Sequence, residues 1–360
     1  MLNRILIATG GTGGHIYPAL TVARKILQLY PDCRLVFAGG EYGPEKEMAA
    51  RAGIEFKSFP AKGVLGKGIK SLGSLFWVSK SLILCYGFLR SLKPEVVVGF
   101  GGYAGFMPVL TAGWMKIPTA VHEQNSLPGM TNRVLGRKVN KIMLTFEDVQ
   151  NFFPPEKVVL TGNPVRPELL KRQYHTSGLH NGEKRLLILG GSQGASAINE
   201  ALLACLDELK AMGVNIWHQT GHGDYERIRD VYLDKYPQAR VEAFIEDMGE
   251  AYDFASLVLC RAGASTLAEL CASGKPSVLI PFPYATQNHQ MINARYMEEA
   301  GAAMVVAQNY LQEINLARVI GDLLSMPDRL KQMSLAARKQ SRPDAADNIV
   351  QELVKLKKGK

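Results

Sequence analysis

The same local pattern occurs twice in this chain. Residues 4–11 read RILIATGG and residues 185–191 read RLLILGG, and each run is followed by a small-residue turn and a helical pattern. An apolar strand that passes through glycines into a helix is the opening unit of a Rossmann-like domain. The repetition therefore predicts two such domains, for which 360 residues leave enough room.

Fully apolar strands alternate with helical patterns in both halves of the chain. Such alternation is typical of parallel sheets that carry helices on both faces, so we predict the α/β class. Two domains of this kind would place a ligand-binding cleft between the carboxyl ends of their strands. The expected strands are residues 4–9, 34–38, 95–100, 119–122, 141–145 and 158–161 in the first half, and 185–189, 215–219, 241–245, 257–260 and 277–281 in the second.

Basic residues outnumber acidic ones, 42 to 33, and the net charge of +9 indicates an anionic partner. Nucleic acid, a phosphorylated small molecule and a lipid headgroup surface all fit this charge. The sequence has neither an aromatic-basic strand motif nor a recognition-helix pattern, so we predict no nucleic-acid partner.

The five cysteines are widely spaced and include no CxxC pair, which predicts neither a disulfide framework nor a zinc site. The N-terminus, MLNRILIATGG, does not read as a signal segment, so we expect the protein on the cytosolic side of the membrane.

Two glycine-rich turns follow the expected first strands of the two halves. Residues 9–15 read TGGTGGH, and residues 190–195 read GGSQGA. Glycines let backbone N–H groups approach an anion, and the following helix adds the positive end of its dipole. The first turn matches neither a P-loop, which needs Lys-Ser/Thr after the glycines, nor a dinucleotide fingerprint. A tight turn without a ligand is the alternative, but the doubling of the pattern favours phosphate binding.

A third candidate is the segment 261–269, RAGASTLAE, which follows the strand at 257–260. Free N–H groups at the start of its helix could hold a diphosphate, and Glu269 could accept hydrogen bonds from ribose hydroxyls. The alternative is a capped helix with a solvated glutamate.

Eight motifs occur in order along nearly the whole chain. They include GGTGGHIYPAL, HEQNSLPGMTNR, GNPVR and CRAGASTLAEL, and they lie at residues 10–20, 99–110, 122–133, 162–166, 190–195, 244–248, 260–270 and 281–294. In this order and spacing they resemble the MurG family of bacterial peptidoglycan N-acetylglucosaminyltransferases. One glycine motif would say little, whereas eight ordered motifs are specific.

The resemblance implies the GT-B fold, which has two Rossmann-like domains with parallel sheets facing a central cleft. We expect an N-terminal acceptor and membrane domain at 1–163, a C-terminal UDP-GlcNAc-binding domain at 164–341, and a helix at 342–360 that packs back on the first domain. The implied reaction is inverting transfer of GlcNAc from UDP-GlcNAc to the C4 hydroxyl of the N-acetylmuramoyl-pentapeptide on undecaprenyl diphosphate (lipid I), which gives lipid II. The resemblance implies that the reaction needs no cofactor.

The resemblance also assigns roles to residues at matching positions. Asn125 would contact the donor sugar, Ile245 would read the uracil through its backbone, and Glu269 would hold the ribose. Gly102 and Tyr103, in the turn GGYAG, could receive the acceptor, although a turn without a ligand also fits. The full donor set is Thr12, Gly13, Gly14, Asn125, Arg166, Ser192, Ile245, Ala264, Ser265, Thr266, Leu267, Ala268, Glu269 and Gln290.

One loop departs from the pattern of the Gram-negative members of the family. Residues 283–290 read PYATQNHQ, where that pattern is shorter and ends in paired glutamines. His289 replaces the first glutamine of the pair, and Gln290 keeps the second. The sequence therefore does not decide which residues of this loop contact the sugar.

Inverting transfer needs a base for the attacking hydroxyl and stabilisation of the charge on the departing UDP. His15 opens the first helix beside the glycine turn and is the first candidate for the base. His122 and Glu123 are further candidates, and a hydrogen-bonded structural histidine is the alternative in each case. Because the chain has no Asp-x-Asp motif, we predict no metal; helix N-termini, turn amides and Arg166 would supply the counter-charge.

The segment between Glu55 and Glu95 contains no acidic residue and several basic ones. Lys80 and the serines make it too polar to span a bilayer, so we predict a peripheral face that meets anionic lipids on the cytoplasmic side of the inner membrane. A helix buried on both sides is the alternative. Helical spacing predicts a core-facing stripe at Leu72, Leu75, Phe76, Ser79, Leu82, Ile83 and Tyr86, and a membrane face at Trp77, Lys80, Leu84 and Phe88.

Two other functions fit part of the pattern. A UDP-GlcNAc 2-epimerase of the same fold would share the nucleotide-binding half but would not need the basic, aromatic surface at 62–93. A sugar-nucleotide-binding membrane protein without activity would not need His15, Asn125 and Glu269. Labelled UDP-GlcNAc with a lipid I analogue separates transfer, epimerisation and mere binding.

Overall fold

The computed structural model describes residues 1–11, 13–41, 43–60, 72–172, 174, 182–191 and 194–359, except for the side chains of 72–77. The chain forms two compact units. The first comprises Met1–Arg166 with Arg342–Lys360, and the second comprises Pro167–Ser341.

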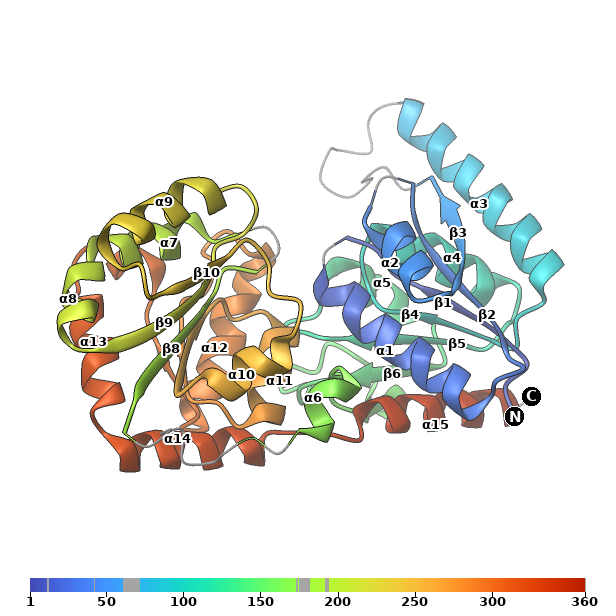
Figure 1. Ribbon diagram of the computed structural model, residues 1–360. Coiled ribbons are helices and arrows are strands. Elements are labelled where there is room, and N and C mark those ends of the chain that lie inside the picture. The colour runs from blue at the N-terminus through green and yellow to red at the C-terminus, as the bar shows by residue number, and fades with distance from the viewer. Residues whose placement is uncertain are drawn as a thin grey trace. The chain divides into compact units, whose positions relative to one another are not determined.

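The first unit is built on a parallel sheet with the strand order β3-β2-β1-β4-β5-β6-β7. Helices lie on both faces of this sheet (Figure 1). The strands are β1 (Arg4–Ala8), β2 (Arg34–Gly40), β3 (Glu55–Phe59), β4 (Val96–Gly99), β5 (Thr119–Glu123), β6 (Lys141–Leu144) and β7 (Val158–Leu160). The helices are α1 (Gly13–Leu29), α2 (Glu45–Arg51), α3 (Leu72–Leu92), α4 (Tyr103–Trp114), α5 (Met130–Gly136) and α15 (Ala345–Lys358).

The side chains of successive residues of β1 pack alternately into the two hydrophobic cores of the first unit. Ile5 and Ile7 pack with α1, α2 and α15 on one face of the sheet. Leu6 and Ala8 pack with α3, α4 and α5 on the other. Since side chains alternate along a strand, a segment buried on both faces must be apolar, as β1 is from Ile5 to Ala8.

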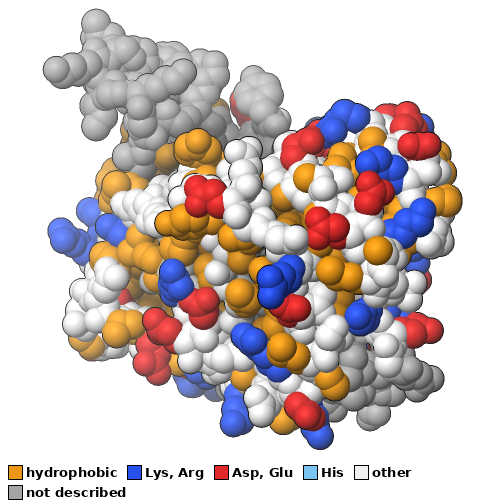
Figure 2. Space-filling view, turned by 90° about the vertical axis from the view of Figure 1, so that its left-hand side faces the viewer, with side chains coloured by type: hydrophobic (Ala, Val, Ile, Leu, Met, Phe, Trp, Pro, Cys, Tyr) orange, Lys and Arg blue, Asp and Glu red, His pale blue; other side chains and the backbone are white. Residues whose placement is uncertain are grey.

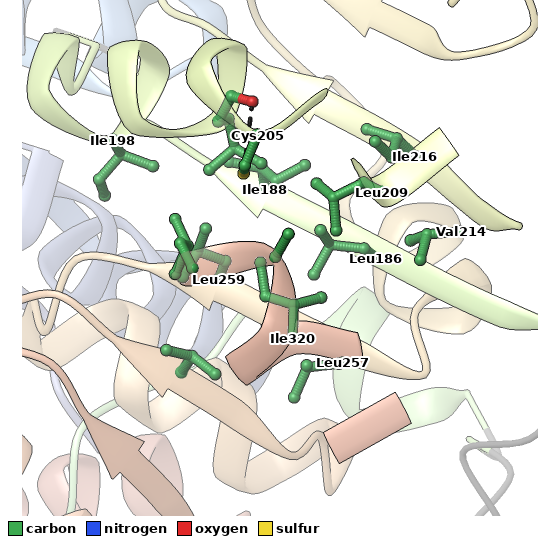
Figure 3. Packing of buried hydrophobic residues seen from close by; sticks show 14 of the residues in the cluster. Leu186, Ile188, Ile198, Cys205, Leu209, Val214, Ile216, Leu257, Leu259 and Ile320 are labelled. Carbon is green, nitrogen blue, oxygen red and sulfur yellow. Dashed lines mark hydrogen bonds between the residues drawn. The ribbon is translucent and has the colours of Figure 1, made fainter. Parts of the chain in front are cut away.

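The second unit repeats the arrangement with the order β10-β9-β8-β11-β12-β13. Its core joins Leu186 and Ile188 of β8 to Ile216 of β9, Ile198 of α7 and Ile320 of α13 (Figure 3). The strands are β8 (Lys184–Leu189), β9 (Val214–Gln219), β10 (Arg240–Glu242), β11 (Leu257–Cys260), β12 (Ser277–Leu279) and β13 (Ala303–Val305). The helices are α6 (Pro167–Lys171), α7 (Ser196–Ala204), α8 (Leu206–Ala211), α9 (Tyr225–Lys235), α10 (Met248–Phe254), α11 (Ala264–Ser273), α12 (His289–Glu299), α13 (Leu316–Leu324) and α14 (Pro327–Lys339).

Both sheets therefore confirm the predicted α/β class with two doubly wound parallel sheets. In each sheet the strand order reverses beside the first strand, between β1 and β4 and between β8 and β11. Open α/β sheets bind ligands at the carboxyl ends of the strands at this switch point. These two positions are where the glycine turns lie.

Two strands were not expected from the sequence, and several expected strands are shorter. The edge strand β3 (EFKSF) is largely exposed and lacks the apolar run on which the prediction relies, whereas β13 (AMV) is apolar but has only three residues. The strand expected at 241–245 ends at Glu242, because β10 pairs with β9 alone and over three residues only.

The surface on the side of α8, α9 and α13 mixes basic, acidic and apolar side chains (Figure 2). This is the pattern of an ordinary globular surface rather than of a basic stripe. No helix in the described ranges has both the length and the apolar character that crossing a bilayer requires.

Candidate functional site

The turns after β1 and β4 pack directly against each other at the switch point of the first sheet. A Cβ on Gly10 would lie 2.6 Å from the Cβ of Ala104. Gly102 has φ +76°, and a Cβ there would lie 2.0 Å from the carbonyl oxygen of Gly10. Glycine is therefore needed at both positions for the two turns to approach.

A buried carboxylate supports the first turn from α2. Glu45 is 1% exposed, and its Oε1 accepts a hydrogen bond from the Gly11 backbone N–H at 2.9 Å. Its second oxygen, Oε2, is buried and has no hydrogen-bond partner. Glu45 is not recognisable from the sequence, because only the fold brings α2 under the turn.

The first-unit candidates follow three adjacent strands, β1, β4 and β5, at the same edge of the sheet. Gly13 and Gly14 open α1, and His15 follows in its first turn. The half-buried ring of His15 lies against Gly101, where a Cβ would come within 2.8 Å of its Cδ2. Gly102 caps α4, and Tyr103 begins it with an exposed side chain. Thr12 lies outside the described residues.

His122 is fully buried, and both of its ring nitrogens are engaged. Nε2 lies 2.9 Å from the Gly162 carbonyl oxygen, and Nδ1 lies 3.2 Å from Nε2 of Gln124. Burial lowers the pKa of His122 to about 4. This geometry offers no ring nitrogen to a substrate hydroxyl, so it favours the structural alternative for His122.

Glu123 is also buried, and its carboxylate organises the loop that follows β5. Oε1 accepts from the backbone N–H of Asn125 at 3.0 Å and from its side-chain amide at 3.3 Å. Oε2 accepts from the Gly129 N–H at 3.0 Å and from Nδ2 of Asn132 at 2.8 Å. With four donors around it, Glu123 fits a role in positioning Asn125 better than a role as base.

In the second unit, the glycine turn after β8 approaches the end of β9. Cβ atoms on Gly190 and Gly194 would each lie 2.9 Å from backbone oxygens, those of Gln219 and Thr220. Gly194 also has φ +76°, which favours glycine. Ser192, the candidate in this turn, lies outside the described residues.

A buried polar chain fixes the helix that follows this turn. His218 lies 3.0 Å from Oδ1 of Asn199, whose amide donates to Asp224 at 2.8 Å. Ser196, the first residue of α7, donates to the same Asp224 oxygen at 2.8 Å. These residues are not among the predicted site residues; the available signal in the sequence is a histidine within an otherwise apolar strand.

At the switch point of the second sheet, α11 starts directly after β11. Its N-cap, Gly263, has an extended backbone and provides no side-chain cap, and the positive end of the helix dipole at this point favours an anion. Of the predicted run, Ser265, Thr266 and Ala268 are half-buried, whereas Ala264, Leu267 and Glu269 are buried. Ala264 and Leu267 can therefore offer a ligand only their backbone groups.

Glu269 lies inside α11 and is held by a neighbouring helix. Its Oε2 accepts a hydrogen bond from the hydroxyl of Tyr252 on α10 at 3.0 Å, and Tyr252 is fully buried. The carboxylate thus has a fixed orientation at the ligand-binding end of the sheet.

The remaining donor candidates are spread over loops and over both units. Ile245 is buried in the loop after β10. Gln290 is the second residue of α12, and its Oε1 accepts a hydrogen bond from the Phe282 N–H at 2.9 Å, so it organises the loop that differs from the Gram-negative pattern. Arg166 ends the first of the two chain segments that form the first unit, and its guanidinium lies over the ring of Tyr17 at 5.1 Å.

Arg261 was not predicted as a site residue, although it precedes α11. Its guanidinium donates to the Ile280 carbonyl at 3.1 Å and to Oε1 of Gln308 at 2.7 Å. Burial lowers its pKa to about 10. Arg261 therefore ties the ends of two strands together rather than pointing at the start of α11.

The expected orientation of α3 is correct in part only: Lys80 and Leu84 are exposed as predicted, but the core-facing side differs. Ser81, Cys85 and Leu89 face the core, and Phe88 packs edge-on against Phe59 with centroids 5.8 Å apart. Ile83 and Tyr86, expected in the core, are 71% and 49% exposed. Apolar residues occur all around this helix, so spacing alone does not fix its phase, and the small side chains decide which side packs.

An exposed apolar face does exist on α3. Leu84 is 44% exposed beside Ile83 and Tyr86, and Lys80 is also exposed. Trp114, which was not predicted, ends the neighbouring α4 and is 59% exposed. The side chain of Trp77 lies outside the described residues.

Both halves of the chain match one family of enzymes. The N-terminal domain of glycosyltransferase family 28 matches residues 5–144, and its C-terminal domain matches residues 185–349. A protein of Solidesulfovibrio magneticus is 47% identical over 365 residues, 99% of this chain and 98% of that protein. It is named UDP-N-acetylglucosamine–N-acetylmuramyl-(pentapeptide) pyrophosphoryl-undecaprenol N-acetylglucosamine transferase.

Solved structures agree in fold. A crystal structure of MurG from Acinetobacter baumannii is 31% identical, with a TM-score of 0.80 over 98% of this chain and 99% of that one. A UDP-GlcNAc 2-epimerase from Neisseria meningitidis, bound to UDP-GlcNAc, is 17% identical, with a TM-score of 0.67 over 98% of this chain and 100% of that one. The second similarity concerns the fold alone.

Proposed function

The chain belongs to the MurG family of glycosyltransferase family 28, and on that basis we propose that it transfers GlcNAc from UDP-GlcNAc to lipid I. The C4 hydroxyl of the N-acetylmuramoyl group attacks C1 of GlcNAc while the bond from C1 to the UDP oxygen breaks. The hydroxyl loses its proton, UDP leaves with the bonding electrons, and the linkage inverts from α to β. The product is lipid II.

The donor is held mainly by the second unit. The N–H groups at the start of α11 and those of the glycine turn after β8 stabilise the negative charge of the UDP diphosphate. Glu269, fixed by Tyr252, accepts hydrogen bonds from the ribose hydroxyls. Ile245 presents backbone groups to the uracil, and Arg166 adds positive charge. Because the sequence has no Asp-x-Asp motif, a chelator should leave turnover unchanged.

The acceptor and the base belong to the first unit. His15 takes the proton from the attacking hydroxyl, since it is half-buried in the first turn of α1 and its ring lies against the turn after β4. Asn125, fixed by Glu123, contacts the sugar of the donor. Gly102 and Tyr103 receive the acceptor at the start of α4.

The chain reaches its lipid-linked acceptor through α3. The exposed side chains of Ile83, Leu84 and Tyr86 enter the bilayer interface, and Lys80 attracts anionic headgroups. Trp114 suits the same interface, because its ring is apolar and its N–H is polar. The protein is thus peripheral to the membrane, on the cytoplasmic side.

The observation that carries this function is the 47% identity over nearly the full length of a protein with that transferase name. Incubation with labelled UDP-GlcNAc and a lipid I analogue tests it. Label in the lipid product supports transfer. Conversion of UDP-GlcNAc to its 2-epimer without lipid labelling would favour the epimerase, and retention without turnover would favour a binding protein.

A further inference from the structure

A pocket that none of the proposed roles uses lies in the first unit. Its volume is about 540 Å³, which is within the range of small-molecule sites. It is lined where α4 and α15 end and where β5 and β6 begin. Asn125 follows the opposite end of β5, so the pocket and the candidate site lie at opposite edges of the sheet.

The lining of this pocket is rich in lysine. Lys116, Lys138, Lys141 and Lys355 contribute, against one carboxylate, that of Glu352. Helix ends add partial negative charge, about half a charge at each of the two that end here. The four ammonium groups exceed this negative charge.

The carboxylate is already engaged within the pocket wall. Glu352 is 9% exposed, and its Oε1 pairs with Lys355 at 2.6 Å while its Oε2 lies 4.0 Å from Lys141. Lys116 and Lys138 are exposed and pair with no carboxylate among the residues that the structure describes. These two ammonium groups are therefore available to an anion.

The side-chain amide of Asn140 adds neutral hydrogen-bond donors to the pocket. Oδ1 of Asn140 accepts from the backbone N–H of Thr119 at 2.9 Å and from its hydroxyl at 3.2 Å. With its oxygen occupied, Asn140 has its amide N–H groups left to donate. Ammonium and amide donors around one cavity suit phosphate oxygens.

We propose that this pocket binds a small ligand with two or more phosphate groups. The ligand is either a free polyphosphorylated metabolite or the headgroup of an anionic phospholipid; the chemistry recognised is the same. Binding here is independent of the transfer reaction, because the pocket shares no residue with the donor and acceptor sets.

Inorganic tripolyphosphate is the probe, and the amide NMR signals of Thr119 and Asn140 are the site-specific readout. We expect saturable shifts of both signals in the full chain. Lys116→Gln/Lys138→Gln should weaken binding about tenfold, since it removes two charges next to the anion. Lys331→Gln/Lys339→Gln, an equal charge change on exposed lysines of α14, should leave affinity within about twofold. Absence of shifts, or equal affinity in the pocket variant and wild type, overturns the proposal.

Two further measurements separate the sources and the proposals. Flotation with vesicles that contain cardiolipin, whose headgroup carries two phosphate groups, should fall in the pocket variant if the ligand is a lipid headgroup. Unchanged flotation with weaker tripolyphosphate binding identifies a free metabolite. Transfer activity without added phosphate should be the same in the pocket variant and wild type, so failure of either proposal leaves the other testable.

Discussion

The buried carboxylate of Glu45 accepts a hydrogen bond from the backbone N–H of Gly11 at 2.9 Å, and through it α2 holds the first glycine turn. A buried carboxylate is costly unless it is hydrogen-bonded. Here one oxygen is bonded and the other is not. Burying Glu45 therefore lowers the stability of the fold, but its hydrogen bond fixes the turn that precedes His15.

Replacing Glu45 should separate these two effects. Glu45→Ala leaves the Gly11 N–H without its partner and should cost about 1–3 kcal/mol of the free energy of unfolding of the first unit. It should also lower kcat, because the turn loses its support. Glu45→Gln keeps an acceptor oxygen and should lose less of both. Urea denaturation and steady-state kinetics measure them, and equal kcat in the two variants would contradict the positioning role.

The role of His15 as base predicts a specific kinetic pattern. His15→Ala should lower kcat about 10²–10⁴-fold, the usual contribution of general base catalysis. The affinity for UDP, measured by calorimetry, should remain, because the residues proposed to bind the nucleotide lie mainly in the second unit. Near-normal turnover with an unchanged pH profile would eliminate His15 as the base.

Local sequence predicts the fold better than it predicts the roles of buried polar groups. The strands β1 and β8 are recognisable because each is an apolar run that ends in glycines. The role of Glu123 is not recognisable, because its partners Gly129 and Asn132 meet it only after α5 has packed. The role of His122 is not recognisable either, because its partner Gly162 lies 40 residues further along the chain, after β7.

The orientation of α3 and the edge strand β3 could not be predicted from the sequence either. The phase of α3 depends on where Ser81 and Cys85 let the helix approach the sheet. The edge strand β3 reads EFKSF, is largely exposed and pairs on one side only, with β2. Such features depend on neighbours far along the chain.

The hydrogen bond from Tyr252 to Glu269 predicts an effect on donor binding. Tyr252→Phe should raise KM for UDP-GlcNAc about tenfold, the lower end of the effect of losing one hydrogen bond to a charged group, with a smaller change in kcat. Tyr236→Phe is a matched control, because Tyr236 is buried in the same unit and its hydroxyl donates to the Val214 carbonyl at the opposite end of the sheet. A similar KM change in both variants would indicate a general loss of stability.

The buried histidines predict acid sensitivity in both units. Burial lowers the pKa of His122 to about 4 and that of His218 to about 3, against about 6.5 in an unfolded chain. Between pH 6.5 and 4 the unfolded chain binds protons that the folded chain does not, so stability is present above pH 6.5 and is lost as the pH falls. Urea unfolding at several pH values should show this slope.

A variant of His122 separates its contribution from that of His218. His122→Asn should flatten the pH dependence of the first unit between pH 6.5 and 4, because it removes a group that takes up one proton on unfolding. The slope of the second unit should persist. If His122→Asn leaves the slope of the first unit unchanged, other groups dominate its acid response.

The exposed face of α3 predicts how the protein binds membranes. Ile83→Ser/Tyr86→Ser should reduce the fraction bound to phosphatidylglycerol vesicles at least about tenfold, because two exposed side chains lose apolar area that would enter the interface. Leu233→Ser/Leu335→Ser removes equally exposed side chains from the second unit and should leave binding unchanged. Turnover of a water-soluble acceptor analogue should be the same in all variants, since the core side of α3 is intact. Equal vesicle binding by the two double variants would contradict a membrane role for this face.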